Sequence, residues 1–418
     1  MSASPPDAAA GAARARPLRI AHVVPLRAVG GVERSFAEFI AQRGPGLAVE
    51  HAALVLGRGI PPLLDATVRA AAARVELADF RDGRHLAFEP PELRERNLER
   101  ILRELDPDLA LFWNKPMGAD LARLSASLPV LYWERGRSWK ETDAPRARAF
   151  LRGVRAVLCN SEASRRFVQL RWGLPERIPV YVCPNAVRPE SAGAGSRPRA
   201  APRGRALRLG FAGRLVAVKG VPLAIHALAE LARRGLDCEL AIAGEGPDRD
   251  ALARLAAALG VARRVRFEGL VARMPEFYRD IDCLLCPSLR EPFGLVAVEA
   301  LANGCPVIGS RVDGLAEVLD EGGIGIGLVP ELPLARYRAL GGDPEAIPRE
   351  VYDPVADALA APRVLDPLAL ADAVLELLRD AEGYRERSRR GIELAAARFD
   401  FASHVRQVLS ILRAFARA

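Results

Sequence analysis

Lysine is scarce in this sequence of 418 residues, which holds 60 Lys and Arg side chains in total. Only Lys115, Lys140 and Lys219 are lysines, so almost every cation is an arginine. Ammonium and guanidinium groups are not interchangeable. A lysine at the mouth of a ligand-binding turn therefore indicates a specific need for that side chain, and Lys219 occupies such a position.

Long apolar runs are also missing. Half of the residues are hydrophobic, but no run reaches the ~18–20 residues of a transmembrane helix. Residues 1–16 are rich in Ala, Pro and Arg and lack the continuous apolar core of a signal peptide, so we expect a disordered tail. These absences favour a soluble, cytoplasmic protein.

Clustered metal ligands are absent from the sequence as well. The six cysteines lie mostly in apolar runs, which is typical of free buried thiols in a reducing compartment. Cys283 and Cys286 form a single C-x-x-C without a second pair or a His cluster, so we predict no zinc site. D-x-D triplets begin at Asp106, Asp248 and Asp280, before strands or at a helix start. We expect them to be structural and expect no metal.

The net charge of +8 is unevenly distributed. The first 190 residues hold 29 basic and 22 acidic side chains, and the remainder holds 31 and 30. This difference is consistent with a solvated arginine-rich surface or with an anionic acceptor or membrane surface as partner. No recognition helix, finger or aromatic-stacking signature accompanies the charge, which argues against a nucleic-acid partner.

Strand-like and helical patterns alternate along most of the chain, which predicts an α/β protein built on parallel sheets. Residues 188–206, rich in Pro, Gly and Arg, predict a linker. We therefore expect two Rossmann-like domains, residues 17–187 and 207–390, around a central cleft. Many prolines at 330–365 predict an inserted loop, and further helices are expected at 391–418.

The segment from Ser288 to Ile308 is the most informative. Glu291 and Glu299 stand eight positions apart. The pattern is strand, glycine-containing turn, helix and strand, which places one carboxylate in the turn and the other in the helix Leu295–Ala302. Such a pair can bind hydroxyls on two parts of one ligand, while the free N–H groups of the helix N-terminus suit an anion.

Glycine-containing turns follow three predicted strands. Gly213 and Arg214, followed by Lys219, present backbone N–H groups and two cations to a phosphate, although an ordinary surface loop is the alternative. Gly244 begins a similar turn after the next strand. Gly30 and Gly31 open a helix near the N-terminus. They lack the G-x-G-x-x-G dinucleotide fingerprint, but this helix start is a candidate for binding a diphosphate or a sugar acceptor.

Together these motifs resemble those of the retaining glycosyltransferases of the GT-B fold, family 4 type. Residues 291–295, reading E-P-F-G-L, with Glu299 are similar to that family's E-x7-E motif. Gly213-Arg214-Leu215 with Lys219-Gly220, Gly244-Glu245-Gly246-Pro247 and Pro184-Asn185-Ala186-Val187 are similar to its G-R-L…K-G, G-x-G-P and P-N-G-V motifs. The resemblance covers nearly the whole chain and is strongest from Leu207 to Leu328.

The resemblance implies a role for each motif. Arg214 and Lys219 would hold the diphosphate of a nucleotide sugar, and two such cations would stabilise the charge that builds on the leaving group without a metal. Glu291 would accept hydrogen bonds from the donor sugar, and Glu299 would bind the ribose hydroxyls. The backbone N–H groups near Phe293, Gly294 and Leu295 would lie beside Glu291 in the same donor site. The C-terminal helix would return to the N-terminal domain.

One stretch departs from the family pattern. Many relatives place a histidine after an N-domain strand, near the reacting sugar, whereas the matching stretch here offers Glu134 as the acid–base candidate. The alternative is that Glu134 pairs with Arg135 or Arg137. Trp133 and Trp139 are candidates for stacking on a sugar or for core packing.

The function predicted by the resemblance is a hexosyltransferase that moves a sugar from a nucleotide sugar to a glycan or lipid-linked acceptor, for lipopolysaccharide or exopolysaccharide, in the cytoplasm or on the inner face of the membrane. The alternatives are a phosphorylase or nucleotide-sugar epimerase of the same fold, and a non-catalytic subunit that binds the nucleotide sugar. The four residues Arg214, Lys219, Glu291 and Glu299 favour an active transferase.

Overall fold

The computed structural model describes residues 16–27, 30–43, 48–86, 89–116, 124, 126–140, 144–188, 190–191 and 196–417. The chain forms two compact units. The first consists of Met1–Pro184 with Ala402–Ala418, and the second of Asn185–Phe401. Apart from Arg16, the tail predicted at 1–16 lies outside the described residues, as do parts of the linker predicted at 188–206.

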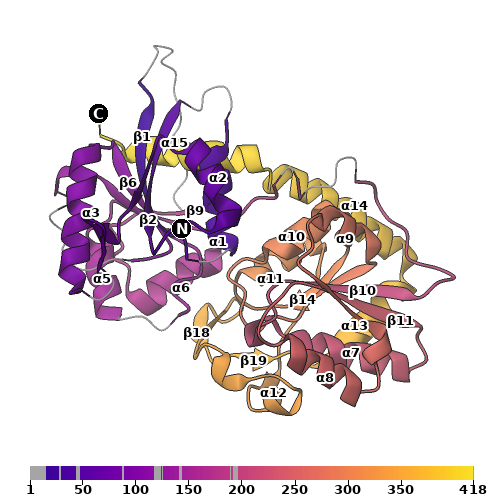
Figure 1. The fold of residues 1–418 in the computed structure, drawn as a ribbon. Helices are drawn as coiled ribbons and strands as arrows, with labels where there is room; N and C mark the ends of the chain where they lie inside the picture. The colour runs from indigo at the N-terminus through magenta and orange to yellow at the C-terminus, as the bar shows by residue number, and fades with distance from the viewer. Residues whose placement is uncertain are drawn as a thin grey trace. The chain divides into compact units, whose positions relative to one another are not determined.

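The first unit is built on a seven-stranded sheet with the order β3-β2-β1-β6-β7-β8-β9 (Figure 1). All of its strand pairs are parallel. The strands are β1 (Leu18–Pro25), β2 (Val49–Leu56), β3 (Arg74–Leu77), β6 (Leu109–Trp113), β7 (Val130–Glu134), β8 (Ala156–Cys159) and β9 (Val180–Val182). The helices are α1 (Gly31–Ala41), α2 (Pro62–Ala71), α3 (Pro91–Leu105), α5 (Ala144–Arg152) and α6 (Glu162–Trp172), and a small hairpin joins β4 (Phe80–Arg81) to β5 (Arg84–His85).

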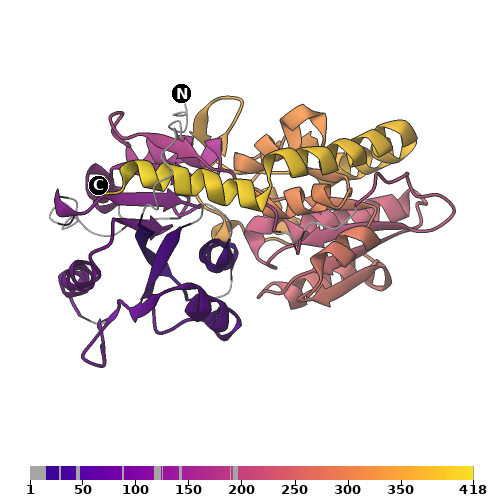
Figure 2. The same ribbon diagram turned by 90° about the horizontal axis from the view of Figure 1, so that it is seen from above.

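The C-terminal helix α15 (Phe401–Phe415) belongs to the first unit from its second residue onward. Its yellow ribbon lies along this unit's strands in Figure 2. Apolar side chains of α15 are at most 3% exposed at Val405, Val408, Leu409, Ile411 and Leu412. The helix therefore completes the core of the first unit, as the family resemblance predicts. Residues 391–401, the start of the segment predicted to return there, belong to the second unit.

The second unit is built on a six-stranded parallel sheet with the order β12-β11-β10-β13-β14-β15. The strands are β10 (Leu207–Ala212), β11 (Cys238–Ala243), β12 (Val265–Gly269), β13 (Cys283–Cys286), β14 (Val307–Ser310) and β15 (Ile326–Leu328). The helices are α7 (Val221–Arg233), α8 (Arg249–Ala258), α9 (Met274–Asp280), α10 (Leu295–Ala302), α11 (Asp313–Asp320), α12 (Arg336–Ala339), α13 (Pro367–Arg379) and α14 (Ala381–Arg398). The α/β class and the two parallel sheets agree with the prediction.

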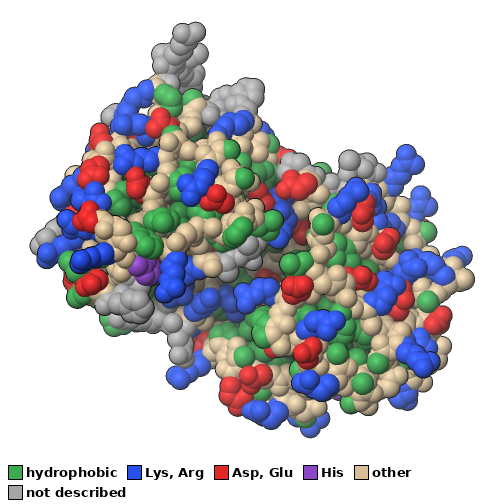
Figure 3. Space-filling model, viewed as in Figure 1, with side chains coloured by type: hydrophobic (Ala, Val, Ile, Leu, Met, Phe, Trp, Pro, Cys, Tyr) green, Lys and Arg blue, Asp and Glu red, His purple; other side chains and the backbone are tan. Residues whose placement is uncertain are grey.

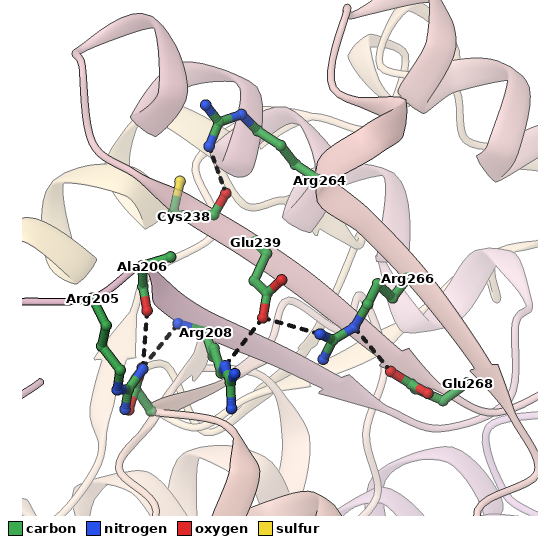
Figure 4. Close-up of polar contacts among 9 residues, drawn as sticks. Arg205, Ala206, Arg208, Cys238, Glu239, Arg264, Arg266 and Glu268 are labelled. Carbon is green, nitrogen blue, oxygen red and sulfur yellow. Dashed lines mark hydrogen bonds and ion pairs between the residues drawn. The ribbon is translucent and has the colours of Figure 1, made fainter.

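Opposite charges connect the strands at the β12 edge of this sheet (Figure 4). Glu239 on β11 lies between two arginines, 3.2 Å from Arg208 on β10 and 3.1 Å from Arg266 on β12. Arg266 also pairs with Glu268 at 3.1 Å. Such cross-strand pairs support the register, but exposed ion pairs contribute little stability.

Residues 330–365 are more ordered than the predicted loop. They form two short antiparallel pairs, β16 (Leu332–Pro333) with β19 (Arg363–Val364) and β17 (Val351–Asp353) with β18 (Ala358–Ala360). Buried Tyr337 donates a hydrogen bond of 2.6 Å to the carbonyl of Ala217. Periodicity could not reveal these elements, because each is only two to four residues long.

Other predicted features keep structural roles. All six cysteines are free and buried. Asp108 accepts a 2.8 Å hydrogen bond from the backbone N–H of Arg19, and Asp282 accepts one of 2.8 Å from that of Arg208.

Basic and acidic side chains are interspersed on the face seen in Figure 3. No described helix has both the length and the apolar character that a membrane crossing requires.

Candidate functional site

The candidate site of the second unit begins with its strand order. Strand β10 pairs with β11 on one side and with β13 on the other. The order of the strands therefore reverses beside β10. Ligands of open α/β sheets bind at the carboxyl ends of the strands next to such a reversal.

The loops that follow β10 and β11 are held together by backbone contacts. The N–H of Leu215 donates a 2.9 Å hydrogen bond to the carbonyl of Glu245. Gly244 has φ +140°, and a Cβ there would lie 1.9 Å from the carbonyl oxygen of Gly213. Only glycine allows this approach, so the two predicted glycine turns form one rigid surface.

The loop that carries Lys219 is also fixed against the loop after β13. Gly220 has φ +69°, and a Cβ there would lie 1.9 Å from the carbonyl oxygen of Pro287. The N–H of Leu289 donates a 2.9 Å hydrogen bond to the carbonyl of Val218. Segments more than 60 positions apart thus bring Lys219 and Glu291 together.

Lys219 and Glu291 form an ion pair. Their side chains are 26% and 12% exposed, so both remain within reach of a ligand. Arg214, on the same loop, is exposed and makes no side-chain hydrogen bond or ion pair with another described residue. The loop therefore offers one paired and one unpaired cation beside a carboxylate.

Asp313 positions Glu291 from the start of α11. Its Oδ2 accepts a 2.9 Å hydrogen bond from the backbone N–H of Glu291, and its Oδ1 accepts one of 2.7 Å from that of Tyr352. Asp313 is fully buried and has φ +46°, which is uncommon for a residue other than glycine. The sequence analysis missed it, although an aspartate opening a helix after a strand was a possible signal.

Glu299 lies on α10 and is 4% exposed. Its Oε2 accepts a 3.0 Å hydrogen bond from the hydroxyl of Tyr278, and its Oε1 accepts one of 3.3 Å from Arg188. Burial, and then the charge of Glu299, raise the pKa of Tyr278 well above its usual value. A carboxylate has about four lone-pair sites, so Glu299 retains capacity for a ligand hydroxyl. Arg188 and Tyr278 were not predicted as site residues.

The N-terminus of α10 completes this part of the site. Gly294 precedes the helix with φ +94°, and a Cβ there would lie 2.7 Å from Leu315. Phe293 is buried, and the helix begins at Leu295. The first N–H groups of a helix have no intrahelical acceptor and carry partial positive charge. The N–H groups at the start of α10 come a few residues after Glu291 in the chain, and they suit an anionic or hydroxyl-rich ligand.

Gly30 and Gly31 lie in the first unit, at the start of α1. Gly30 has φ −131°, which any residue can adopt. A Cβ on Gly30 would lie 2.7 Å from the carboxylate of the flexible Glu33 side chain, and one on Gly31 would meet nothing within 4 Å. The backbone therefore does not require glycine at either position, and their predicted contact with a ligand stays a prediction.

Glu134 has a structural role instead of the predicted catalytic one. It is fully buried at the end of β7. Its Oε1 accepts hydrogen bonds from the N–H groups of Gly136 at 2.7 Å and Ser138 at 3.0 Å, and its Oε2 accepts one from Tyr132 at 2.6 Å. Burial raises the pKa of Glu134. The contacts hold the turn after β7, and no solvent-accessible surface is left for a substrate.

The two tryptophans that were candidates for stacking on a sugar are likewise buried. Trp133 is 0% and Trp139 is 1% exposed. Trp139 stacks on Phe167 with a centroid distance of 4.2 Å, and buried Arg135 lies 4.9 Å from the Trp133 ring centroid. The alternative of core packing is therefore correct, and these rings are not available to a sugar.

Comparison with known proteins finds a family match within the second unit. Residues 196–334 match the family described as Glycosyl transferases group 1. An uncharacterized glycosyltransferase of Methanocaldococcus jannaschii is 40% identical over 125 residues, which are 29% of this chain and 32% of that protein. The matches to the first curated relatives span about a third of the length of those relatives.

Solved structures extend the similarity over both units. A glycosyltransferase of Rickettsia africae superposes with a TM-score of 0.69 at 15% identity, covering 96% of this chain and 98% of that one. HepE of Anabaena, in complex with UDP and glucose, gives 0.65 at 18% identity, covering 95% and 100%. The chain therefore has the GT-B fold, and its segment 196–334 matches the family model of the group 1 glycosyl transferases.

Proposed function

We propose that this protein is a glycosyltransferase that transfers a sugar from a nucleotide-diphosphate sugar to an acceptor with retention of the anomeric configuration. The observation that carries the proposal is the Lys219–Glu291 pair. It is assembled from two loops at the strand-order reversal, beside Arg214 and the N-terminus of α10. This arrangement lies in the segment that matches the family.

Each residue has a role that follows from its chemistry. Arg214 and Lys219 bind the diphosphate and stabilise the negative charge that develops on it as the anomeric bond breaks. Glu291, oriented by Asp313, accepts hydrogen bonds from the hydroxyls of the donor sugar. Glu299, held by Tyr278 and Arg188, accepts hydrogen bonds from the ribose.

Backbone groups contribute to the same donor site. The glycine loops at Gly213 and Gly244 bring main-chain atoms close to the phosphates. The N–H groups at Phe293, Gly294 and Leu295 meet the sugar and the phosphate at the start of α10. The acceptor is a glycan or a lipid-linked sugar, and the protein acts in the cytoplasm or at the inner face of an anionic membrane.

Two alternatives differ in the reaction. A phosphorylase would use inorganic phosphate in place of a second sugar, and an epimerase would release the modified sugar. A non-catalytic subunit would bind the nucleotide sugar without turnover. The presence of both cations and both carboxylates favours the transferase over the subunit.

A thermal-shift screen against UDP-, GDP-, ADP- and dTDP-linked sugars tests the donor site. A donor at 100 times its dissociation constant should stabilise the folded state by about 2.7 kcal/mol. The stabilisation should be smaller in Arg214→Ala, which loses one contact with the diphosphate, and unchanged in Arg254→Ala, an exposed arginine on α8. If none of the four donor classes raises the melting temperature, the proposed function is wrong.

Chelation tests the role assigned to the cations. Because Arg214 and Lys219 neutralise the diphosphate, turnover should be unchanged in excess EDTA. Metal-assisted transfer would instead depend on a bound cation as Lewis acid. Complete loss of turnover that is restored by Mg²⁺ or Mn²⁺ would contradict the assignment, and turnover before and after dialysis against EDTA measures it.

A further inference from the structure

The first unit contains a pocket that none of the predicted motifs explains. Its volume is about 630 Å³, within the range of small-molecule sites. Its walls follow the carboxyl ends of β1 and β2 and include the start of α2 at Pro61 and Pro62. This end of a parallel sheet is where α/β proteins place ligands.

The charged residues of the pocket are mostly basic. Arg27, Arg58 and Arg94 line it together with His85 and a single carboxylate, Asp79. None of the three arginines makes an ion pair or a side-chain hydrogen bond with another described residue. Unpaired arginines gathered at one concave site repel one another, and an anion relieves that repulsion.

Arginines on the neighbouring helices behave differently. On α2, Arg69 pairs with Asp65 at 2.9 Å, and on α3, Arg103 pairs with Glu99 at 2.5 Å. The unit therefore has carboxylates available for its surface arginines. Arg94 lies on the same helix as Arg103 but faces the pocket, so its lack of a carboxylate partner is a property of the pocket.

A fourth cation contributes to the local field. Lys115 follows β6, and burial lowers its pKa to about 8. The charges of Arg27 and Arg94 lower this pKa further, whereas that of Asp79 raises it. Lys115 therefore lies close enough to Arg27, Arg94 and Asp79 to interact with their charges, and it adds a cation beside the pocket.

Asp79 limits the kind of anion that the pocket can accept. It is 4% exposed and lines the pocket beside the arginines. A carboxylate repels a second anionic group but accepts hydrogen bonds from hydroxyls. The ligand that matches this wall carries one compact anionic group for the arginines and hydroxyls for Asp79. Arginine forks match phosphate geometry, and the positive end of α2 adds to the attraction.

We propose that this pocket binds the phosphate group of a phosphorylated sugar or polyol, and that this ligand is the acceptor, or the terminal unit of the acceptor, of the transfer reaction. The role of this ligand as acceptor rests on the proposed function. The proposal places the anionic recognition at Arg27, Arg58 and Arg94 and not at the buried Arg135.

Glucose 6-phosphate is the probe, with glucose as its uncharged counterpart. Isothermal titration calorimetry on the full chain should detect binding of glucose 6-phosphate, with competition by inorganic phosphate, and no comparable binding of glucose. Arg94→Gln should weaken the binding by roughly tenfold or more, because a charge-assisted hydrogen bond is lost. Arg96→Gln, an exposed arginine on the same helix outside the pocket, should bind like the wild type.

A lipid phosphate would show the same chemistry from another source. Co-sedimentation with phosphatidylcholine vesicles that contain phosphatidic acid separates the two sources, because a lipid-borne phosphomonoester would give Arg94-dependent pelleting. Arg94-dependent binding of either probe supports the pocket. Equal binding by the wild type and Arg94→Gln, equal weakening by Arg96→Gln, or binding of neither probe would overturn it.

The donor screen on the same preparations separates this proposal from the proposed function. A donor that stabilises the protein, combined with no Arg94-dependent phosphate binding, refutes the pocket alone. Arg94-dependent phosphate binding without any donor refutes the transferase and with it the ligand's role as acceptor. Circular dichroism of each variant confirms that a loss of binding is not a loss of fold.

Discussion

Lys219→Ala and Arg214→Ala should each reduce the turnover of the nucleotide sugar by roughly 10²-fold or more. Both cations, which we propose bind the diphosphate, lie on a loop that is locked by glycine contacts. Their interaction grows as charge moves onto the leaving group, so its loss lowers kcat more than it changes donor binding. Initial rates at saturating donor measure the effect.

The two substitutions differ in their structural side effects. Lys219→Ala leaves Glu291 without its partner, whereas Arg214 is exposed and unpaired among the described residues. Arg214→Ala should therefore keep the melting temperature of the wild type and is the cleaner test. Arg254→Ala is the matched control and should retain full turnover. Wild-type rates in both Lys219→Ala and Arg214→Ala would remove the phosphate assignment.

The second unit shows how much a local pattern can predict. Helix α10 has the bounds Leu295–Ala302 that its apolar run predicts. Glu291 lies in a turn and Glu299 in a helix, as predicted. Both positions follow from the local sequence pattern of strand, glycine-containing turn and helix. The pairing of Lys219 with Glu291 was not a separate prediction, since it depends on the contact between Gly220 and Pro287.

The sequence could not assign three residues to a site or to the core, for one physical reason. Glu134, Trp133 and Trp139 have polar or amphipathic side chains that suit a site or a core equally well. Their burial is decided by packing against residues such as Phe167 and by hydrogen bonds to the turn at Gly136. One sequence does not reveal such contacts.

The tertiary structure also reveals site residues that the sequence motifs do not contain. Asp313 accepts a hydrogen bond from the backbone N–H of Glu291, from a segment that looked like an ordinary helix start. Arg188 donates one to the carboxylate of Glu299, from a segment that was predicted to be a linker. The basic pocket joins Arg27, Arg58 and Arg94 from three separate segments. The uneven charge was consistent with a solvated surface or with an anionic partner for the first half, and the sheet topology determines which arginines line the pocket.

Deleting Ala402–Ala418 should unfold or aggregate the first unit. The deletion removes Val405, Val408, Leu409, Ile411 and Leu412, all of which are buried in that unit. At about 1.5–3 kcal/mol for each buried side chain, the loss is on the order of 10 kcal/mol. A whole domain is stable by only about 5–15 kcal/mol. Size-exclusion chromatography and thermal unfolding of the truncated chain measure the outcome.

A single substitution tests the same packing without shortening the chain. Leu412→Ala should destabilise the protein by about 2–5 kcal/mol, because the side chain is 0% exposed and its removal leaves a cavity. Arg406→Ala, on the exposed side of α15, should change the stability by less than about 0.5 kcal/mol. The helix would be dispensable for the core if the truncated chain remained monomeric with the melting temperature of the full chain and if Leu412→Ala behaved like Arg406→Ala.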